Sequence, residues 1–167
     1  KMMEVIPAII IASGSLPEGV PEDFFARLAR LSKTIGAKFI VDTSGIPLQM
    51  AAREGVYLLK PNLSELSSLA GKAYLQLDEV EAAARKIIAE GHCEVLVVSM
   101  GPAGALLITR DQYVSIPAPI VKRKSTVGAG DSMVGGMAWM MEQGGSLLEM
   151  VRFGVACGTA ATMNPGT

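Results

Sequence analysis

The chain has almost no net charge and few cysteines, and each of these scarcities argues against a class of function. Its 167 residues carry 15 Lys and Arg against 16 Asp and Glu, which leaves a net charge of −1. Without a basic excess, the sequence indicates neither a nucleic-acid-binding protein nor one that binds anionic membranes. The two cysteines, Cys93 and Cys157, are too few for a disulfide framework and have no metal-site spacing. We therefore expect reduced thiols in a cytoplasmic protein.

Long apolar runs and several sequence motifs are absent too. No stretch reaches the roughly 20 apolar residues that a membrane-spanning helix needs, and the first residues do not resemble a signal peptide. The chain has no G-x-G-x-x-G directly after a strand, no G-x-x-x-x-G-K-[ST] and no G-x-S-x-G. These absences argue against a dinucleotide-dependent dehydrogenase, a P-loop enzyme and an α/β-hydrolase, respectively.

What the chain does have is apolar residues, which make up 50% of it, against 19% charged residues. That balance is apolar for a free-standing soluble domain. Buried parallel strands would explain it, and so would surfaces that meet segments outside this chain; we expect both. The length is sufficient for one domain with a real core.

Apolar runs alternate with amphipathic runs, a pattern typical of α/β proteins. Strands are expected at residues 7–12, 37–41, 56–59 and 94–99, followed by a hairpin of 104–109 and 112–116. Helices are expected at 21–35, 47–54, 62–71 and 78–91, with two more that begin near 131 and 146. We therefore predict an α/β fold in which helices cover both faces of a parallel sheet.

Polar loops follow four of the predicted strands, at 13–15, 42–45, 60–62 and 99–101. In open α/β sheets, ligands bind beyond the carboxyl ends of the strands, so we expect these loops to border one cleft. Each loop also has a plainer interpretation: a turn at 13–17, a helix cap at Asp42, a surface lysine at Lys60 and a strand-to-strand turn after Ser99.

The most specific signal is the segment 125–132, Ser-Thr-Val-Gly-Ala-Gly-Asp-Ser, where a glycine-rich turn leads into an apolar helical run. Its glycines let backbone N–H groups face one point, and the helix N-terminus adds partial positive charge there. Such a turn suits the phosphoryl group that is transferred in a kinase, and Asp131 could take the proton of the attacking hydroxyl. Taken alone, the pattern favours a plainer role for Asp131, that of the helix N-cap.

The stretch 126–131, Thr-Val-Gly-Ala-Gly-Asp, resembles the signature of the ribokinase/PfkB-type sugar kinases. Three further stretches match that family in the expected order: 13–17, 60–65 and 97–104. The context of 125–134 and 149–156 looks most like the 6-phosphofructokinase branch. The resemblance covers essentially the whole chain but only the later part of the family's sequence. It implies that residues 1–167 are the nucleotide-binding and catalytic portion of a ribokinase-like domain, truncated, with the N-terminal part and lid absent.

The resemblance also implies a role for each candidate residue. Asp131 would be the catalytic base and contact the sugar, the N–H groups about Gly128, Ala129 and Gly130 would bind the transferred phosphoryl group, and Ser15 would face the sugar. The implied nucleotide-binding residues are Lys60, Asn62, Ser99, Gly101, Gly104, Ser125, Val127 and Asn164. The implied magnesium-binding residues are Glu65, Asn62 and Asp42. Asn62-x-x-Glu65 also has the spacing of a helix capping box, and the two interpretations are compatible.

The implied reaction is transfer of phosphate from ATP, with Mg²⁺, to a sugar phosphate: fructose 6-phosphate to fructose 1,6-bisphosphate. Tagatose 6-phosphate and fructose 1-phosphate are alternative substrates, and a nucleotide-binding fragment without turnover of its own is an alternative of another class. A potassium ion (K⁺) at Ser125 and Val127 stays open, because Ser-Thr-Val stands where the commoner family motif has Asp-Thr-Thr. The family further implies a homodimer for the full-length protein.

Overall fold

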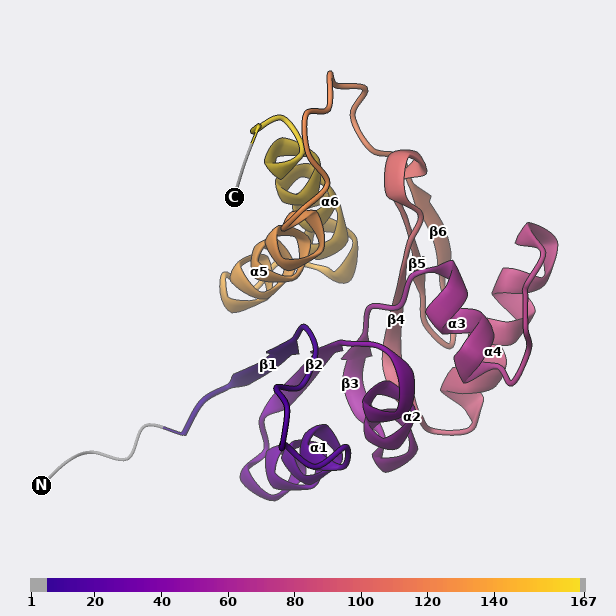
Figure 1. Ribbon diagram of the computed structural model, residues 1–167, viewed down its shortest axis with the longest axis vertical. Helices are drawn as coiled ribbons and strands as arrows, with labels where there is room; N and C mark the ends of the chain where they lie inside the picture. Colours follow the sequence, from indigo (N-terminus) through magenta and orange to yellow (C-terminus); the bar gives the residue numbers. More distant parts are fainter. Residues whose placement is uncertain (1–5, 166–167) are drawn as a thin grey trace, which may run out of the picture.

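The computed structural model describes residues 6–165, which form one six-stranded sheet with helices on both faces (Figure 1). The strands lie side by side in chain order: β1 (Ile9–Ser13), β2 (Lys38–Asp42), β3 (Val56–Leu59), β4 (Cys93–Ser99), β5 (Ala105–Ile108) and β6 (Tyr113–Ile116). The first four pair in parallel, which confirms the predicted parallel sheet. The predicted hairpin extends it with antiparallel strands, because the turn between β4 and β5 is too short for a crossover.

The helices divide into two layers. The first four pack on one face: α1 (Phe24–Ile35), α2 (Gly45–Glu54), α3 (Leu63–Leu69) and α4 (Val80–Ala89). The last two, α5 (Ala129–Glu142) and α6 (Leu147–Ala161), pack on the other. Figure 1 shows the α5–α6 pair, in orange and yellow, on the side of the sheet opposite α1 and α2. Among residues 6–165, no helix has both the length and the hydropathy to span a membrane.

The strands have continuous apolar sequences because both of their faces are buried. In β2, Phe39 and Val41 pack under α1–α4, whereas Ile40 between them packs under α5 and α6. In β4, Val98 and Val97 divide between the same two cores. Such double burial is the usual reason why parallel strands lack a polar alternation.

Glycines allow α5 and α6 to pack in close contact. A β-carbon at Gly154 would lie 2.9 Å from the carbonyl oxygen of Met133, and one at Gly158 would lie 2.9 Å from that of Ala129. Gly136 faces Cys157 across the same contact, where a β-carbon would lie 2.8 Å from the sulfur. The close approach holds the start of α5 against α6, which matters because α5 begins at the glycine-rich turn.

Candidate active site

The four polar loops lie at one edge of the sheet, beyond the carboxyl ends of the parallel strands. Ser13 ends β1 and is directly paired with Asp42, which ends β2. Lys60 follows β3, and its N–H donates to the carbonyl of Val41 at 3.1 Å. Ser99 ends β4, and its N–H donates to the carbonyl of Pro61 at 2.9 Å. The strands therefore bring polar residues from distant parts of the sequence into one row, as expected.

Lys60 and Asp42 form an ion pair within this row. Lys60 Nζ lies 3.0 Å from Asp42 Oδ1, and the two side chains are 6% and 16% exposed. Burial raises the pKa of Asp42; the nearby Lys60 ammonium opposes that rise, and the Asp131 carboxylate adds to it. Lys60 is therefore not the surface lysine of the plainer interpretation, since its cation is directed inward toward a carboxylate.

Asp131 contacts this row from the other layer of the fold. The Ser13 hydroxyl donates to Asp131 Oδ1 at 2.7 Å, across 118 positions of the chain. Asp131 is the third residue of α5, not its N-cap, and the N-cap position belongs to Gly128. The helix-cap interpretation of Asp131 is therefore wrong: no side chain caps α5, and this carboxylate bonds to β1 instead.

The turn before α5 has the backbone geometry that its glycines suggested. Gly128 has φ +74°, a left-handed conformation that residues with side chains rarely adopt. Within residues 6–165, the N–H groups of Gly130 and Asp131 donate no hydrogen bond. A β-carbon at Gly130 would lie 3.7 Å from both Lys60 Nζ and Asp42 Oδ2. The helix start thus presents open N–H groups beside a buried cation, an arrangement suited to an anion.

A cavity of about 320 Å³ opens beside this turn. Lys60, Ala129 and Gly130 border it near the polar row. The remaining lining comes from the β3 and β4 loops, the segment before α5, and α6: Asn62, Ser99, Gly101, Pro102, Gly104, Ala118, Pro119, Arg123, Thr126, Met133, Val155, Gly158, Thr159 and Thr162. Asp42, Asp131 and Ser13 are not among the described residues that line it. Gly130, which borders the cavity and lies beside Asp42, therefore links a ligand-sized space to the carboxylates.

The pair Asn62 and Glu65 forms a capping box at the start of α3. Asn62 Oδ1 accepts from the Glu65 N–H at 2.9 Å, and Glu65 Oε2 accepts from the Asn62 N–H at 2.8 Å. Within the described part of the chain, no group of three or more His, Cys, Asp or Glu side chains is placed to hold a metal ion. Asp42 is paired with Lys60, and Glu65 is paired with the N–H of Asn62.

A family model described as pfkB family carbohydrate kinase matches residues 7–167. The chain belongs to this family. It is 46% identical over 161 residues to ATP-dependent 6-phosphofructokinase isozyme 2 of Escherichia coli, covering 96% of this chain and 52% of that protein. It is 41% identical over 133 residues to 1-phosphofructokinase of Xanthomonas campestris, covering 77% of this chain and 42% of that protein.

The fold agrees with this membership. A crystal structure of phosphofructokinase-2 from Escherichia coli in complex with potassium matches with a TM-score of 0.89 and 46% identity. That match covers 95% of this chain and 52% of the other. The predicted α/β kinase fold is thus confirmed. The chain spans about half the length of the curated relatives it matches.

Eight of the expected site residues of this pfkB-family chain are not among the described residues that line the cavity: Ser15, Asp42, Glu65, Ser125, Val127, Gly128, Asp131 and Asn164. Ser15 is exposed beyond Gly14. Ser125 accepts a hydrogen bond from the Val127 N–H at 3.2 Å, in the turn before Gly128. Asn164 is exposed in the turn after α6. Their roles stay predictions.

Sequence reasoning missed two groups of residues that border the site. Ser13 belongs to the expected 13–15 loop, in which the family resemblance points to Ser15; the signal for Ser13 is its place as the last residue of a strand, opposite Asp42. Arg123, Thr159 and Thr162 line the cavity without belonging to any motif. Only the packing of α6 against the segment before α5 brings these residues together, since the N–H of Lys124 donates to the Thr162 carbonyl at 2.7 Å.

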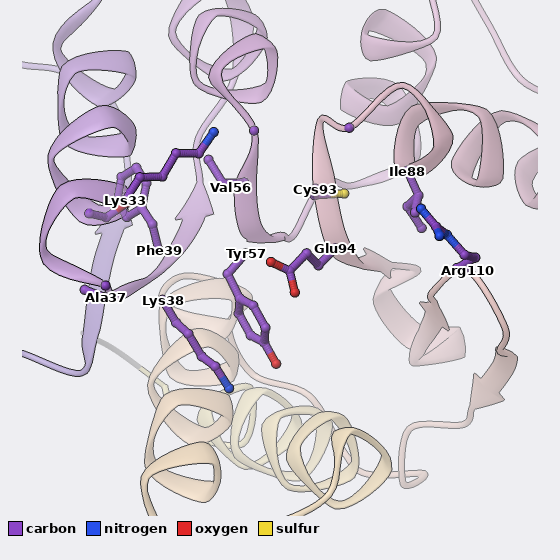
Figure 2. Close-up of a pocket in the computed structure, with 14 residues that line it drawn as sticks. Lys33, Ala37, Lys38, Phe39, Val56, Tyr57, Ile88, Cys93, Glu94 and Arg110 are labelled. Atoms are coloured by element: carbon purple, nitrogen blue, oxygen red, sulfur yellow. The ribbon is translucent and has the colours of Figure 1, made fainter.

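A larger cavity, about 580 Å³, lies at the opposite edge of the sheet (Figure 2). The ends of α1, α2 and α4 meet there, and their carbonyl groups carry partial negative charge. Two of its cations have structural partners: Lys33 donates to the carbonyl of Glu54, and Lys38 lies 4.5 Å from the centre of the Tyr57 ring. Figure 2 shows Lys38 and Tyr57 directed away from Lys33, with Arg110 set apart. These groups do not converge on one point, so the smaller cavity, beside the polar row, is the candidate site.

Proposed function

We propose that the protein containing this chain is an ATP-dependent kinase that converts fructose 6-phosphate to fructose 1,6-bisphosphate. One observation carries the proposal: Asp131, Lys60 and the open N–H groups at the start of α5 converge beside a ligand-sized cavity. These are the parts that phosphoryl transfer requires, namely a base for the hydroxyl and positive groups for the phosphates. Membership of the carbohydrate kinase family supports the same reaction class.

The nucleotide would occupy the 320 Å³ cavity. Ser99, Gly101 and Gly104 border it from the β4 loop, where small residues permit close approach of adenosine to the backbone. Lys60 would contact the phosphates, and the N–H groups of residues 128–131 would stabilise the charge on the transferred group. Gly130 lies at the boundary, beside both the cavity and Asp42, so the γ-phosphate would lie near it.

The sugar would approach from the Asp131 side of the turn. Asp131 accepts the proton of the sugar hydroxyl as that oxygen forms a bond to the γ-phosphorus. The bond between the γ-phosphorus and its bridging oxygen breaks, and ADP leaves with that electron pair. Asp131 then returns the proton to solvent. Ser15 is exposed in the loop after β1 and is our candidate for a hydroxyl donor to the sugar.

Magnesium fits the residues that are present. Mg²⁺ keeps several waters and takes oxygen ligands from phosphates and one or two carboxylates, so it needs no cage of protein side chains. Asn62, which lines the cavity, and its capping-box partner Glu65 would supply oxygen atoms, and Asp42 would supply a carboxylate held by Lys60. When bound, the ion would neutralise charge on the nucleotide phosphates. A potassium ion near Ser125 and Val127 is the further cofactor that we propose, since a similar protein has been crystallised with potassium.

The closest alternative reactions use other sugar phosphates, and the similarity to a 1-phosphofructokinase favours fructose 1-phosphate among them. Tagatose 6-phosphate fits the same chemistry. We place the protein in the cytoplasm, as a homodimer, with no nucleic acid or membrane partner. The free thiols of Cys93 and Cys157 support the cytoplasm, and the net charge of −1 argues against nucleic-acid and anionic-membrane partners.

The test is a coupled kinase assay on the complete gene product with all three sugar phosphates, together with calorimetry of Mg²⁺-ATP binding. We expect the highest kcat/KM with fructose 6-phosphate. A higher value with fructose 1-phosphate would replace the substrate and keep the reaction. Nucleotide binding without turnover of any sugar phosphate would instead favour a non-catalytic nucleotide-binding protein, and the kinase proposal would fail.

A further inference from the structure

The hydroxyl of Ser13 lies between the two carboxylates of the site. It donates to Asp131 Oδ1 at 2.7 Å, and its oxygen is 3.5 Å from Asp42 Oδ2. The other oxygen of Asp42 faces Lys60 Nζ at 3.0 Å. Cation, carboxylate, hydroxyl and carboxylate thus follow one another in a row that starts on β3 and ends on α5.

The backbone around Ser13 is fixed from two directions. Ser13 is the last residue of β1 and pairs with Asp42 in the parallel register. The next N–H, that of Gly14, donates to the Asp42 carbonyl at 2.9 Å. The hydroxyl of the buried Thr43 donates to the Gly14 carbonyl at 2.8 Å. The fixed backbone holds the β-carbon of Ser13 in place near Asp131, and the 2.7 Å hydrogen bond favours the rotamer that directs the hydroxyl toward this carboxylate.

The single proton of Ser13 determines what the residue can do. A hydroxyl has one hydrogen to donate, and the 2.7 Å contact is much the shorter of the two. Asp131 Oδ1 therefore receives the hydrogen bond, which leaves Oδ2 available to a substrate. A carboxylate on the third residue of a helix, with no bond to its own helix, has no other side-chain partner within residues 6–165 to set its rotamer.

We propose that Ser13 is a positioning residue for catalysis, which orients the Asp131 carboxylate so that Oδ2 meets the sugar hydroxyl. The inference rests on the proposed function, because it takes Asp131 as the base. Ser13 itself does not need to touch substrate. Small errors in the orientation of a reacting group are costly, and a displacement of about 1 Å can reduce a rate by roughly 10²-fold.

The test compares Ser13→Ala and Ser13→Thr in the complete gene product, with fructose 6-phosphate and Mg²⁺-ATP. We expect Ser13→Ala to lower kcat by roughly 10-fold to 100-fold with the KM for ATP little changed. Ser13→Thr keeps the hydroxyl and should recover most of kcat. The matched control is Ser115→Ala, an exposed serine on β6 that lines neither the cavity nor the polar row, and we expect no effect there.

A second measurement separates positioning from a purely structural role. In an Asp131→Asn background, Ser13→Ala should cause no further loss of kcat, because a residue that acts through Asp131 has nothing left to orient. Multiplying losses in the double variant would overturn the inference, as would a Ser13→Ala variant with normal kcat. If the alanine variant does not fold, Ser13→Cys gives the same comparison with a side chain of similar size and a weak donor. Failure of the unmodified protein to turn over any sugar phosphate would refute the proposed function instead.

Discussion

The helices α3 and α5 begin at the same edge of the sheet, yet their first turns are built in opposite ways. The start of α3 is closed by its own residues, because the side chains of Asn62 and Glu65 each accept an N–H of the other. The start of α5 is open, with Gly128 at the N-cap and no side-chain cap. Its acidic residue, Asp131, bonds to Ser13 on β1 rather than to its own helix.

The comparison shows how one type of sequence signal can have two outcomes. A polar residue near a helix start usually satisfies that helix, and α3 follows this rule. At α5 the same groups stay unsatisfied within residues 6–165, beside a buried ion pair and a cavity. Free N–H groups at a helix start, next to a cation, favour an anion, and the open start therefore supports the phosphate site that we propose.

The largest expected effect comes from Asp131→Asn in the complete gene product. We expect kcat to fall by ~10²–10⁴-fold, because a general base typically contributes that factor. The midpoint of thermal unfolding should stay near that of the unmodified protein, since Asp131 caps no helix. A lower unfolding temperature with normal kcat would reverse the comparison and make α5 an ordinary capped helix. Coupled assays and calorimetric scans measure the two quantities.

Gly158→Ala, on α6, should displace the start of α5, against which Gly158 packs. The new β-carbon would lie 2.9 Å from the carbonyl oxygen of Ala129, the first residue of α5. We expect a loss of about 1–3 kcal/mol in the free energy of unfolding, typical of overpacking, and a raised KM for ATP. The control is Ala156→Gly, exposed on α6, which should cost about 1 kcal/mol of helix propensity and leave KM unchanged. Equal KM values for both variants would contradict the link between helix packing and the nucleotide.

Asn62→Ala tests the capping box that closes the start of α3. Loss of the N-cap should reduce the free energy of unfolding by about 1 kcal/mol. Ser146→Ala is the matched control, because Ser146 and Glu149 form the same capping box at the start of α6, and neither lines the cavity. Both variants should lose similar stability in denaturant titrations, and only Asn62→Ala should also weaken Mg²⁺-ATP binding. If the two behave alike in binding, Asn62 is a cap alone.

The smallest effect is a pH dependence that involves Asp42. Burial raises the pKa of Asp42 above its ordinary value of 3.8, so the folded protein binds this proton more tightly than the unfolded chain. The contribution of this group to stability is therefore present at low pH and is lost as the pH rises through the raised pKa. Asp42→Asn should remove that loss in denaturant titrations between pH 3.5 and about 7.

Glu149 provides the control of opposite sign. Hydrogen bonds from Ser146 lower the pKa of Glu149, so its contribution to stability is present above its unfolded value and is lost as the pH falls. Glu149→Gln should therefore lower stability on the neutral side, where Asp42→Asn does not. A loss of stability at neutral pH in Asp42→Asn would show that pairing with Lys60 outweighs the burial of the Asp42 carboxylate.

Local patterns were sufficient to predict most of the fold and part of the site. The hairpin expected at 104–109 and 112–116 is observed as Ala105–Ile108 and Tyr113–Ile116, because alternating side chains and a polar turn define such a unit locally. The positions of the polar loops after β1–β4 were predicted correctly, since the segments that follow parallel strands all lie at the same edge of the sheet. The capping box was also predictable from the sequence, because Asn62 and Glu65 lie within four residues of each other.

Contacts across the sequence could not be predicted in this way. Asp131 was interpreted, from pattern alone, as a helix cap, because nothing within its own segment points to Ser13, 118 positions away. The contact of Ser13 escapes prediction for a related reason: the strand is expected at 7–12, whereas it includes Ser13 and pairs that residue with Asp42. Arg123 and Thr162 line the cavity only because α6 packs against the segment before α5.

The distance in sequence between Ser13 and Asp131 also has a consequence for the timing of synthesis. At about 5–20 residues per second, the ribosome adds the 118 positions that separate the two residues in roughly 6 to 24 seconds. The first strands and Lys60 therefore leave the ribosome well before the carboxylate that would act as base. On the function that we propose, a nascent chain that ends before residue 131 contains the lysine but lacks the base, and it would not transfer phosphate from ATP.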